Sequence, residues 1–214
     1  MISQKIYLIR HGQTDYNLQG IVQGSGVDAS LNDRGRSQAE AFYNYYRSIP
    51  FERIYVSRLK RSKESVSNFI SNGLPFEEHA ALNEISWGNR EGQRITPEED
   101  AYYHSILRRW QQGETSIPIE GGESPDEVAS RQKPMLDILR ASVSSKPILI
   151  CMHGRAMRIL LCQMLNYPLG SMDMFEHENL GLYLLTRTES QFTVDVYNNT
   201  DHLAAMKAGK EVKA

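Results

Sequence analysis

The chain has 214 residues and a formal net charge of −2, with 40% hydrophobic and 23% charged residues. This composition is typical of a globular protein with a sizeable core and excludes a disordered chain. The charge is balanced and no Lys/Arg-rich block occurs, which argues against a nucleic-acid or membrane-surface partner. No apolar run approaches the roughly 20 residues needed to cross a bilayer. The N-terminus lacks the pattern of a signal peptide, so a cytoplasmic location is expected.

An apolar stretch at residues 6–9 opens the chain and ends at Arg10, His11 and Gly12. Its length and its β-branched and aromatic residues predict a buried strand. The C-terminal end of such a strand lies at the edge where open α/β sheets bind ligands. Arginine offers a planar fork of donors for phosphate, and histidine can act as a nucleophile or proton carrier near neutral pH. The pair therefore indicates chemistry on an anion.

Strand and helix patterns alternate in the next part of the chain. Asn32 or Asp33 is a candidate N-cap for a helix that runs to about Arg47. Residues 53–57 predict a short strand, and Ser57 leads into a further helix. The apolar stripe of that helix consists of Leu59, Val66, Phe69 and Ile70. This alternation predicts a largely parallel sheet with both faces covered by helices.

The middle of the chain, residues 84–124, is less regular and is interpreted as an insertion that roofs a site. It contains glycine-punctuated loops around a helix predicted at 97–112. Ser124 is expected to cap the next helix, at about 125–143, which begins with proline. A second proline inside it, Pro134, predicts a bend.

A second apolar stretch, residues 148–152, ends at His153 and Gly154 and precedes a helix predicted at 156–165. Two strands that both end in His-Gly are hard to explain by packing. Two imidazoles at one sheet edge instead predict a site. The chain's 2 cysteines fall in this strand and this helix without zinc-ligand spacing, and they are interpreted as core residues.

The end of the chain completes the predicted fold. Residues 180–185 and 192–197 predict a closing hairpin, and the tail at 204–214 is expected to fray. No repeat or interdomain linker occurs, so residues 1–214 are expected to form a single domain. The fold class is α/β, with three α/β/α layers and a mostly parallel central sheet.

Residues 8–14, LIRHGQT, resemble the RHG signature of the histidine phosphatase superfamily, the phosphoglycerate mutase-like proteins. Further segments that resemble this family follow in order at 31–35, 57–61, 84–92, 122–124 and 153–154. The ordered series covers nearly the whole chain and is far more specific than any one of its motifs. It implies the phosphoglycerate mutase-like fold and a small phosphate ester as substrate.

The resemblance also implies roles for individual residues. His11 would be the nucleophile that forms a phosphohistidine, and Glu84 the general acid that later activates water. The groups implied to surround the transferred phosphoryl group are Arg10, Arg61 and His153, with Asn17, Gln23, Gly24 and Gly154 as further phosphate- or substrate-binding residues. No metal is implied, because the arginines stabilise the charge of the phosphoryl oxygens. The remaining histidines, interpreted as surface or structural, are His79, His104, His177 and His202.

Phosphatase and mutase share the phosphohistidine step and differ in what accepts the phosphoryl group. The chain is short for a mutase, Arg90 replaces the usual Trp of the family's W-E-G element, and Arg108 and Arg109 fall in a predicted helix. We therefore favour a phosphatase acting on small phosphate esters without a cofactor. The alternative is a cofactor-dependent phosphoglycerate mutase, which would need 2,3-bisphosphoglycerate. Arg90, Arg94 or Arg108 could favour a substrate with a second anionic group.

Two other classes of function stay open on sequence alone. A metal-dependent hydrolase could use His11 and His153 as ligands, although the acidic ligands expected near them are missing. A non-catalytic module could bind a phospholigand at the same place. The sequence also leaves open whether the chain forms a homodimer.

Overall fold

The computed structural model describes residues 3–94, 97–189, 191–204 and 206, and only the backbone of residues 97–99. A six-stranded sheet in the order β3-β2-β4-β1-β5-β6 forms its centre. The strands are β1 (Ser3–Arg10), β2 (Ile54–Val56), β3 (Phe76–Glu78), β4 (Ile148–Met152), β5 (Leu182–Thr188) and β6 (Gln191–Asn199). The α-helices are α1 (Asp15–Gln19), α2 (Asp33–Tyr46), α3 (Lys60–Glu64), α4 (Ser67–Ser71), α5 (Pro97–Gln111), α6 (Pro125–Ala141) and α7 (Gly154–Leu165).

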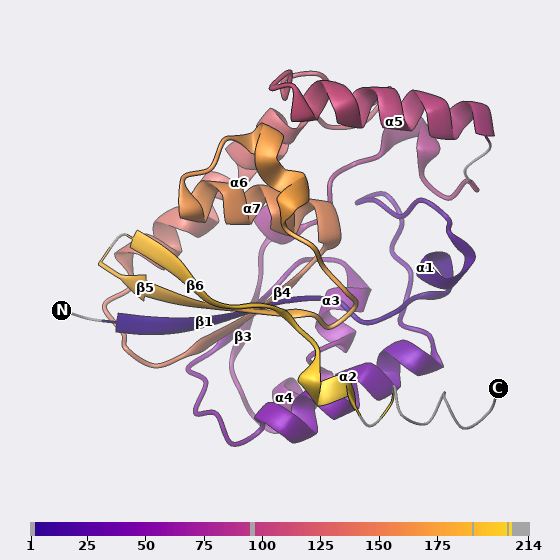
Figure 1. The fold of residues 1–214 in the computed structure, drawn as a ribbon. Coiled ribbons are helices and arrows are strands. Elements are labelled where there is room, and N and C mark those ends of the chain that lie inside the picture. The colour runs from indigo at the N-terminus through magenta and orange to yellow at the C-terminus, as the bar shows by residue number, and fades with distance from the viewer. Residues whose placement is uncertain (1–2, 95–96, 190, 205, 207–214) are drawn as a thin grey trace.

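The sheet is parallel over β3, β2, β4 and β1 and antiparallel over β5 and β6. Helices α6 and α7 cover one face, and α2 and α4 cover the other (Figure 1). The predicted α/β/α fold with a mostly parallel sheet and a closing hairpin is therefore confirmed. Because β1 and β4 are adjacent and parallel, the residues that follow them meet at one edge of the sheet.

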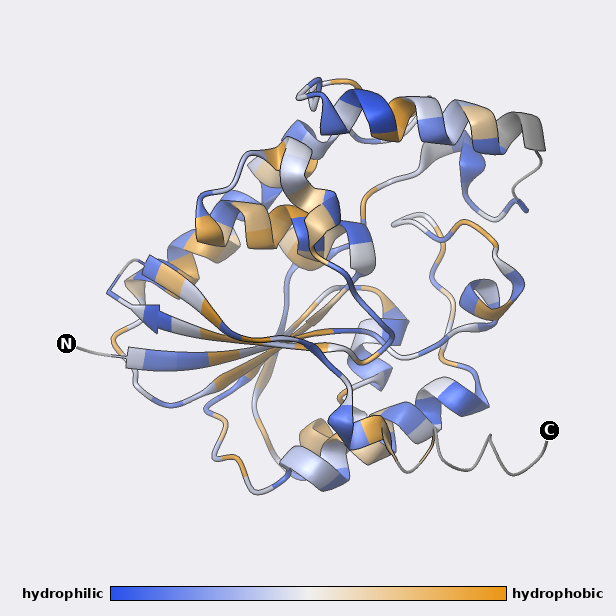
Figure 2. Ribbon diagram, in the orientation of Figure 1, coloured by the Kyte–Doolittle hydropathy of each residue, from blue (hydrophilic) through white to orange (hydrophobic). Residues whose placement is uncertain are grey.

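Strand β4 shows why both faces carry helices. Ile148, Ile150 and Met152 belong to the core on the side of α6 and α7, whereas Leu149 and Cys151 belong to the core on the other side. Side chains alternate along a strand, so a wholly apolar strand fits only a sheet buried on both faces. Figure 2 shows these apolar strands between the two helical layers. The second cysteine is also buried, and both are free thiols, which agrees with the core interpretation.

The predicted helix at 97–112 is confirmed as α5, which lies farthest from the sheet in Figure 1. It buries Ile106 and Trp110 and packs against the 3₁₀ turn Leu169–Met174. Helix α6 begins as expected, capped by Ser124, and continues through Pro134 without interruption.

One predicted helix is wrong in its extent. The segment after Ser57 forms two short helices, α3 and α4, because the backbone of Val66 leaves helical geometry between them, with φ −121° and ψ 12°. Ser65, at the end of α3, keeps a helical backbone. Its hydroxyl accepts a hydrogen bond from the Gly12 N–H at 2.9 Å and donates to the Arg61 carbonyl at 2.6 Å. Ser65 thus ties α3 to the loop that follows β1.

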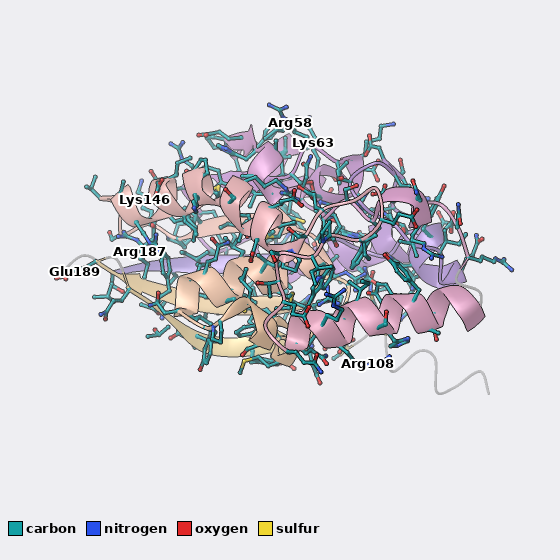
Figure 3. The ribbon with its side chains drawn as sticks, turned by 90° about the horizontal axis from the view of Figure 1, so that it is seen from above. Arg58, Lys63, Arg108, Lys146, Arg187 and Glu189 are labelled. Atoms are coloured by element: carbon teal, nitrogen blue, oxygen red, sulfur yellow. The ribbon has the colours of Figure 1, made fainter. Side chains whose placement is uncertain are left out.

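At the end of the sheet away from α5, Lys146, Arg187 and Glu189 lie together (Figure 3). The predicted fraying beyond Leu203 falls almost entirely outside the described residues. Among the described helices, none is long and apolar enough to cross a membrane.

Candidate active site

His11 follows the last residue of β1 and is buried, with 3% of its surface exposed. Its backbone N–H donates to the Met152 carbonyl at 2.9 Å, and its ring Nδ1 lies 2.7 Å from the Gly12 carbonyl oxygen. A carbonyl only accepts, so we assign the ring proton to Nδ1, which leaves the Nε2 lone pair free. Burial and the nearby guanidinium groups of Arg61 and Arg10 hold the pKa of His11 well below its usual range. The ring is therefore suited to act as a nucleophile.

His153 follows β4 and is fully buried. The centroid of its ring lies 5.1 Å from that of His11, so the two imidazoles share one site. Arg61 Nε donates to its Nδ1 at 3.1 Å, and Ser57 Oγ lies 2.7 Å from its Nε2. This pattern assigns the proton to Nε2, which donates to the serine. Burial and the charge of Arg61 hold the pKa of His153 well below its usual range.

Arg61 is held by several acceptors in the buried region behind the histidines. Its terminal nitrogens donate to the Val27 and Gly24 carbonyls at 2.6 and 3.1 Å. With the Gln23 amide turned so that its nitrogen donates to Thr14, the amide oxygen accepts from Arg61 Nη1 at 3.1 Å. Burial lowers the pKa of Arg61 to about 10. Gly24 thus contributes a carbonyl that positions the arginine.

Glu84 reaches the site from the loop before α5. Its Oε1 accepts from the backbone N–H groups of Ile85 and Ala156 at 3.0 and 2.8 Å, and its Oε2 accepts from that of Arg155 at 3.2 Å. Helix α7 begins at Gly154, so its first free N–H groups fix this carboxyl. The start of α7 therefore positions Glu84 and follows His153 directly.

A cavity of about 270 Å³ lies at this edge of the sheet. Five of the predicted site residues line it, namely Arg10, Asn17, Gln23, Glu84 and Gly154. The other four, His11, Gly24, Arg61 and His153, do not line it. The cavity is also lined by residues that the sequence did not indicate as part of the site, which are Ile21, Trp87, Tyr103, Arg155, Arg158 and His177. Among the described residues, Arg10 Nε is buried without a hydrogen-bond partner. Such an unpaired donor suits an anionic guest.

Asn17 and His177 show how the lining is fixed. Asn17 Oδ1 accepts from the Thr14 N–H at 3.2 Å, so its amide N–H groups are the donors that it can offer to a ligand. His177 Nδ1 lies 3.2 Å from an Arg10 terminal nitrogen. Burial, together with the charge of Arg10, lowers the pKa of His177 to about 2. A methyl group added at Gly154 would lie 2.7 Å from the His177 ring, so a larger residue there would force that ring to move.

The donors around the two histidines do not suit a metal ion. Both ring nitrogens of His153 have other partners, Arg61 and Ser57. In the part of the chain that the structure describes, no three His, Cys, Asp or Glu side chains are arranged to hold a metal. A buried cation beside His153 would also repel a metal ion.

Two neutral imidazoles, buried arginines and a carboxyl meet at the C-terminal edge of a mostly parallel sheet, an arrangement that suits phosphoryl transfer. Residues 6–200 match the family model of the histidine phosphatase superfamily (branch 1), and the chain belongs to this family. Members with curated names are phosphatases or mutases, and this chain is an enzyme of that kind.

Relatives of both kinds are similar over almost their full length. The adenosylcobalamin/alpha-ribazole phosphatase of Salmonella typhimurium is 26% identical over 200 residues, covering 91% of this chain and 96% of that protein. A probable phosphoglycerate mutase, GpmB, of Salmonella choleraesuis is 28% identical over 213 residues, covering 94% and 95%. A mycobacterial glucosyl-3-phosphoglycerate phosphatase, solved with VO3, superposes with a TM-score of 0.80 at 26% identity and covers 92% of this chain and 100% of that one.

Proposed function

We propose that the protein hydrolyses small phosphate monoesters through a phosphohistidine on His11. The observation that carries the proposal is the 5.1 Å separation of the His11 and His153 rings, with Arg10 and Arg61 beside them. This constellation can surround one tetrahedral phosphoryl group. The cavity of about 270 Å³ lies below the roughly 300–1,000 Å³ of drug-sized pockets, which suits a small metabolite.

In the first step, His11 Nε2 attacks phosphorus while the bond to the leaving oxygen breaks and Glu84 gives that oxygen its proton. Arg10 and Arg61 stabilise the charge on the equatorial phosphoryl oxygens, and His153 lies beside them. In the second step, Glu84 takes a proton from water, which attacks the phosphohistidine. The products are inorganic phosphate and an enzyme in its starting protonation state.

The runner-up is a cofactor-dependent phosphoglycerate mutase that requires 2,3-bisphosphoglycerate. A mutase needs further cations on its substrate and a site screened from water. Arg108 is exposed on α5, and Arg109 forms an exposed ion pair with Glu114 at 2.6 Å. Neither arginine lines the cavity. This placement favours water as the acceptor, and hence a phosphatase without a cofactor.

The test is phosphate release from a panel of phosphomonoesters, measured beside an assay that interconverts 3-phosphoglycerate and 2-phosphoglycerate. We expect phosphate release that persists in chelator and little interconversion. Fast interconversion with little release would contradict the proposal in favour of a mutase. Loss of activity in chelator would contradict it in favour of a metal-dependent hydrolase. The His11→Asn protein serves as the blank for both assays.

A further inference from the structure

A second cavity, of about 280 Å³, adjoins the cavity that Arg10 and Glu84 line. The two cavities share five lining residues, which are Asn17, Ile21, Gln23, Trp87 and Tyr103. Three further residues complete the lining of the second cavity, which are Tyr16, Gly20 and Val22. We call this second cavity the apolar groove, because none of the described residues that line it is charged. A charged cavity thus continues into an uncharged one.

One wall of the apolar groove is aromatic and fixed. Trp87 is 7% exposed, and its ring centroid lies 5.4 Å from that of Tyr103 and 6.1 Å from that of Trp110. The guanidinium carbon of Arg155 lies 5.9 Å from the centroid of Trp87. Contacts of this kind stabilise the indole and fix its plane. The aromatic wall is therefore in place before a ligand binds.

The segment that follows α1 forms the other wall. Gly20 ends α1 with φ +66°, in the left-handed region that glycine adopts without strain. The Ile21 N–H then donates to the Tyr16 carbonyl at 2.9 Å, and the Val22 N–H donates to the Gln93 carbonyl at 3.2 Å. These backbone bonds fix the segment that carries Ile21 and Val22. A groove with two fixed walls binds a ligand at a small cost in ordering.

The charge of the adjoining cavity is used up by the phosphoryl group. When Glu84 carries the proton that it donates, the cations that line this cavity are Arg10, Arg155 and Arg158. Arg155 and Arg158 both donate to Asp173, so three positive charges and one negative charge leave a net charge of +2. A phosphate dianion balances this charge. The leaving group therefore needs no charge of its own.

On the basis of the phosphatase activity proposed above, we infer that the leaving group is an uncharged alcohol with an apolar part, of about the size of one ring, that binds in the apolar groove. Burial in the groove removes apolar surface from water, and the Trp87 and Tyr103 rings add aromatic contacts. The arginines that the sequence suggested for a second anionic group line neither cavity, these being Arg90, Arg94 and Arg108. Specificity is therefore assigned to the apolar groove.

The experiment compares substrates that differ only at the far end of the leaving group. 3-Phenylpropyl phosphate carries a ring where 3-hydroxypropyl phosphate carries a hydroxyl group, and both release a primary alcohol of similar acidity. We expect kcat/KM to be at least about tenfold higher for the phenyl compound, since burial of a ring has about that effect. Tyr16→Ser, which alters the groove alone, should lower this preference by about threefold or more. Tyr45→Ser, which removes a tyrosine from an exposed position on α2, should retain it.

Equal kcat/KM values in the unmodified enzyme, a preference for the hydroxyl compound, or an unchanged preference in Tyr16→Ser would overturn the inference. Binding of 3-phenylpropylphosphonate and 3-hydroxypropylphosphonate to the unmodified protein, measured by calorimetry, needs neither turnover nor a folded variant. We expect the phenyl compound to bind at least about tenfold more tightly and to be displaced by inorganic phosphate. Equal affinities, or tight binding that inorganic phosphate does not displace, would overturn the inference. If no phosphomonoester is hydrolysed but the phosphonates still differ in this way, only the proposed function fails.

Discussion

The substitution Glu84→Gln separates the chemical role of this residue from its structural role. The carboxyl accepts hydrogen bonds from Ile85, Ala156 and Arg155 through backbone N–H groups. An amide can keep the two bonds to Oε1, but its nitrogen then faces the Arg155 N–H and cannot accept. The Arg155 N–H is then a buried donor without an acceptor, so we expect the free energy of unfolding to fall by about 1–3 kcal/mol.

The effect on activity should depend on the leaving group. An alkyl oxygen must be protonated as it leaves, so loss of the general acid should lower kcat/KM for an alkyl phosphate by about 10²–10⁴-fold. A p-nitrophenolate ion leaves without a proton, so kcat/KM for p-nitrophenyl phosphate should fall much less. The variant should also accumulate phosphoenzyme with that substrate, because the base that activates water is missing. The assays are steady-state kinetics with both esters and chemical denaturation.

The matched control is Glu123→Gln. Glu123 accepts from the Ser86 N–H at 2.8 Å and pairs with Arg131, but it does not line the cavity. This variant should lose stability while the ratio of kcat/KM for the two esters stays constant. If Glu84→Gln lowered kcat/KM equally for both esters, the assignment of Glu84 as the general acid would be refuted.

Three further outcomes follow from the geometry. Gly35→Ala places a methyl group 2.1 Å from the Gln13 carbonyl oxygen. It should therefore lower the free energy of unfolding by at least about 1–3 kcal/mol, and an unchanged denaturation midpoint would contradict the packing described. Ser57→Ala leaves the His153 Nε2–H without its acceptor, so the free energy of unfolding should fall by about 1–3 kcal/mol and kcat should fall as well. Ser57→Thr should restore both quantities. No change in either quantity in Ser57→Ala would refute the assigned tautomer. The pKa of buried histidines such as His153 is lowered, so below pH about 6.5 the unfolded chain binds protons that the folded chain does not. Urea denaturation should therefore show full stability above that pH and a loss of up to about 1.4 kcal/mol per pH unit for each such histidine below it, and a flat profile between pH 7.5 and 5 would contradict this.

The main features of the fold could be predicted because the spacing of the apolar residues and the positions of capping residues and prolines mark the same element boundaries. The apolar run of β4 has the length of a strand and leads directly into α7, and Ser124 with Pro125 marks the start of α6. The break at Val66 could not be predicted, because neither glycine nor proline marks it in the sequence. The short edge strand β3 has no alternating pattern and was also missed.

The central pair of the candidate site could be predicted for the same reason. His11 and His153 each end an apolar strand, and parallel pairing of those strands brings them together. His177 and Arg155 were missed because neither stands at a strand end. His177 reaches the cavity from a loop, and Arg155 lies on a helix, where an arginine is ordinarily solvated.

The central claim is that His11 carries the phosphoryl group, and rapid quenching with a ³²P-labelled phosphomonoester tests it directly. We expect an acid-labile, alkali-stable phosphate on the protein that maps to His11 and is absent from His11→Asn. Substrate hydrolysis with no trapped phosphate, or label that persists in His11→Asn, would contradict it.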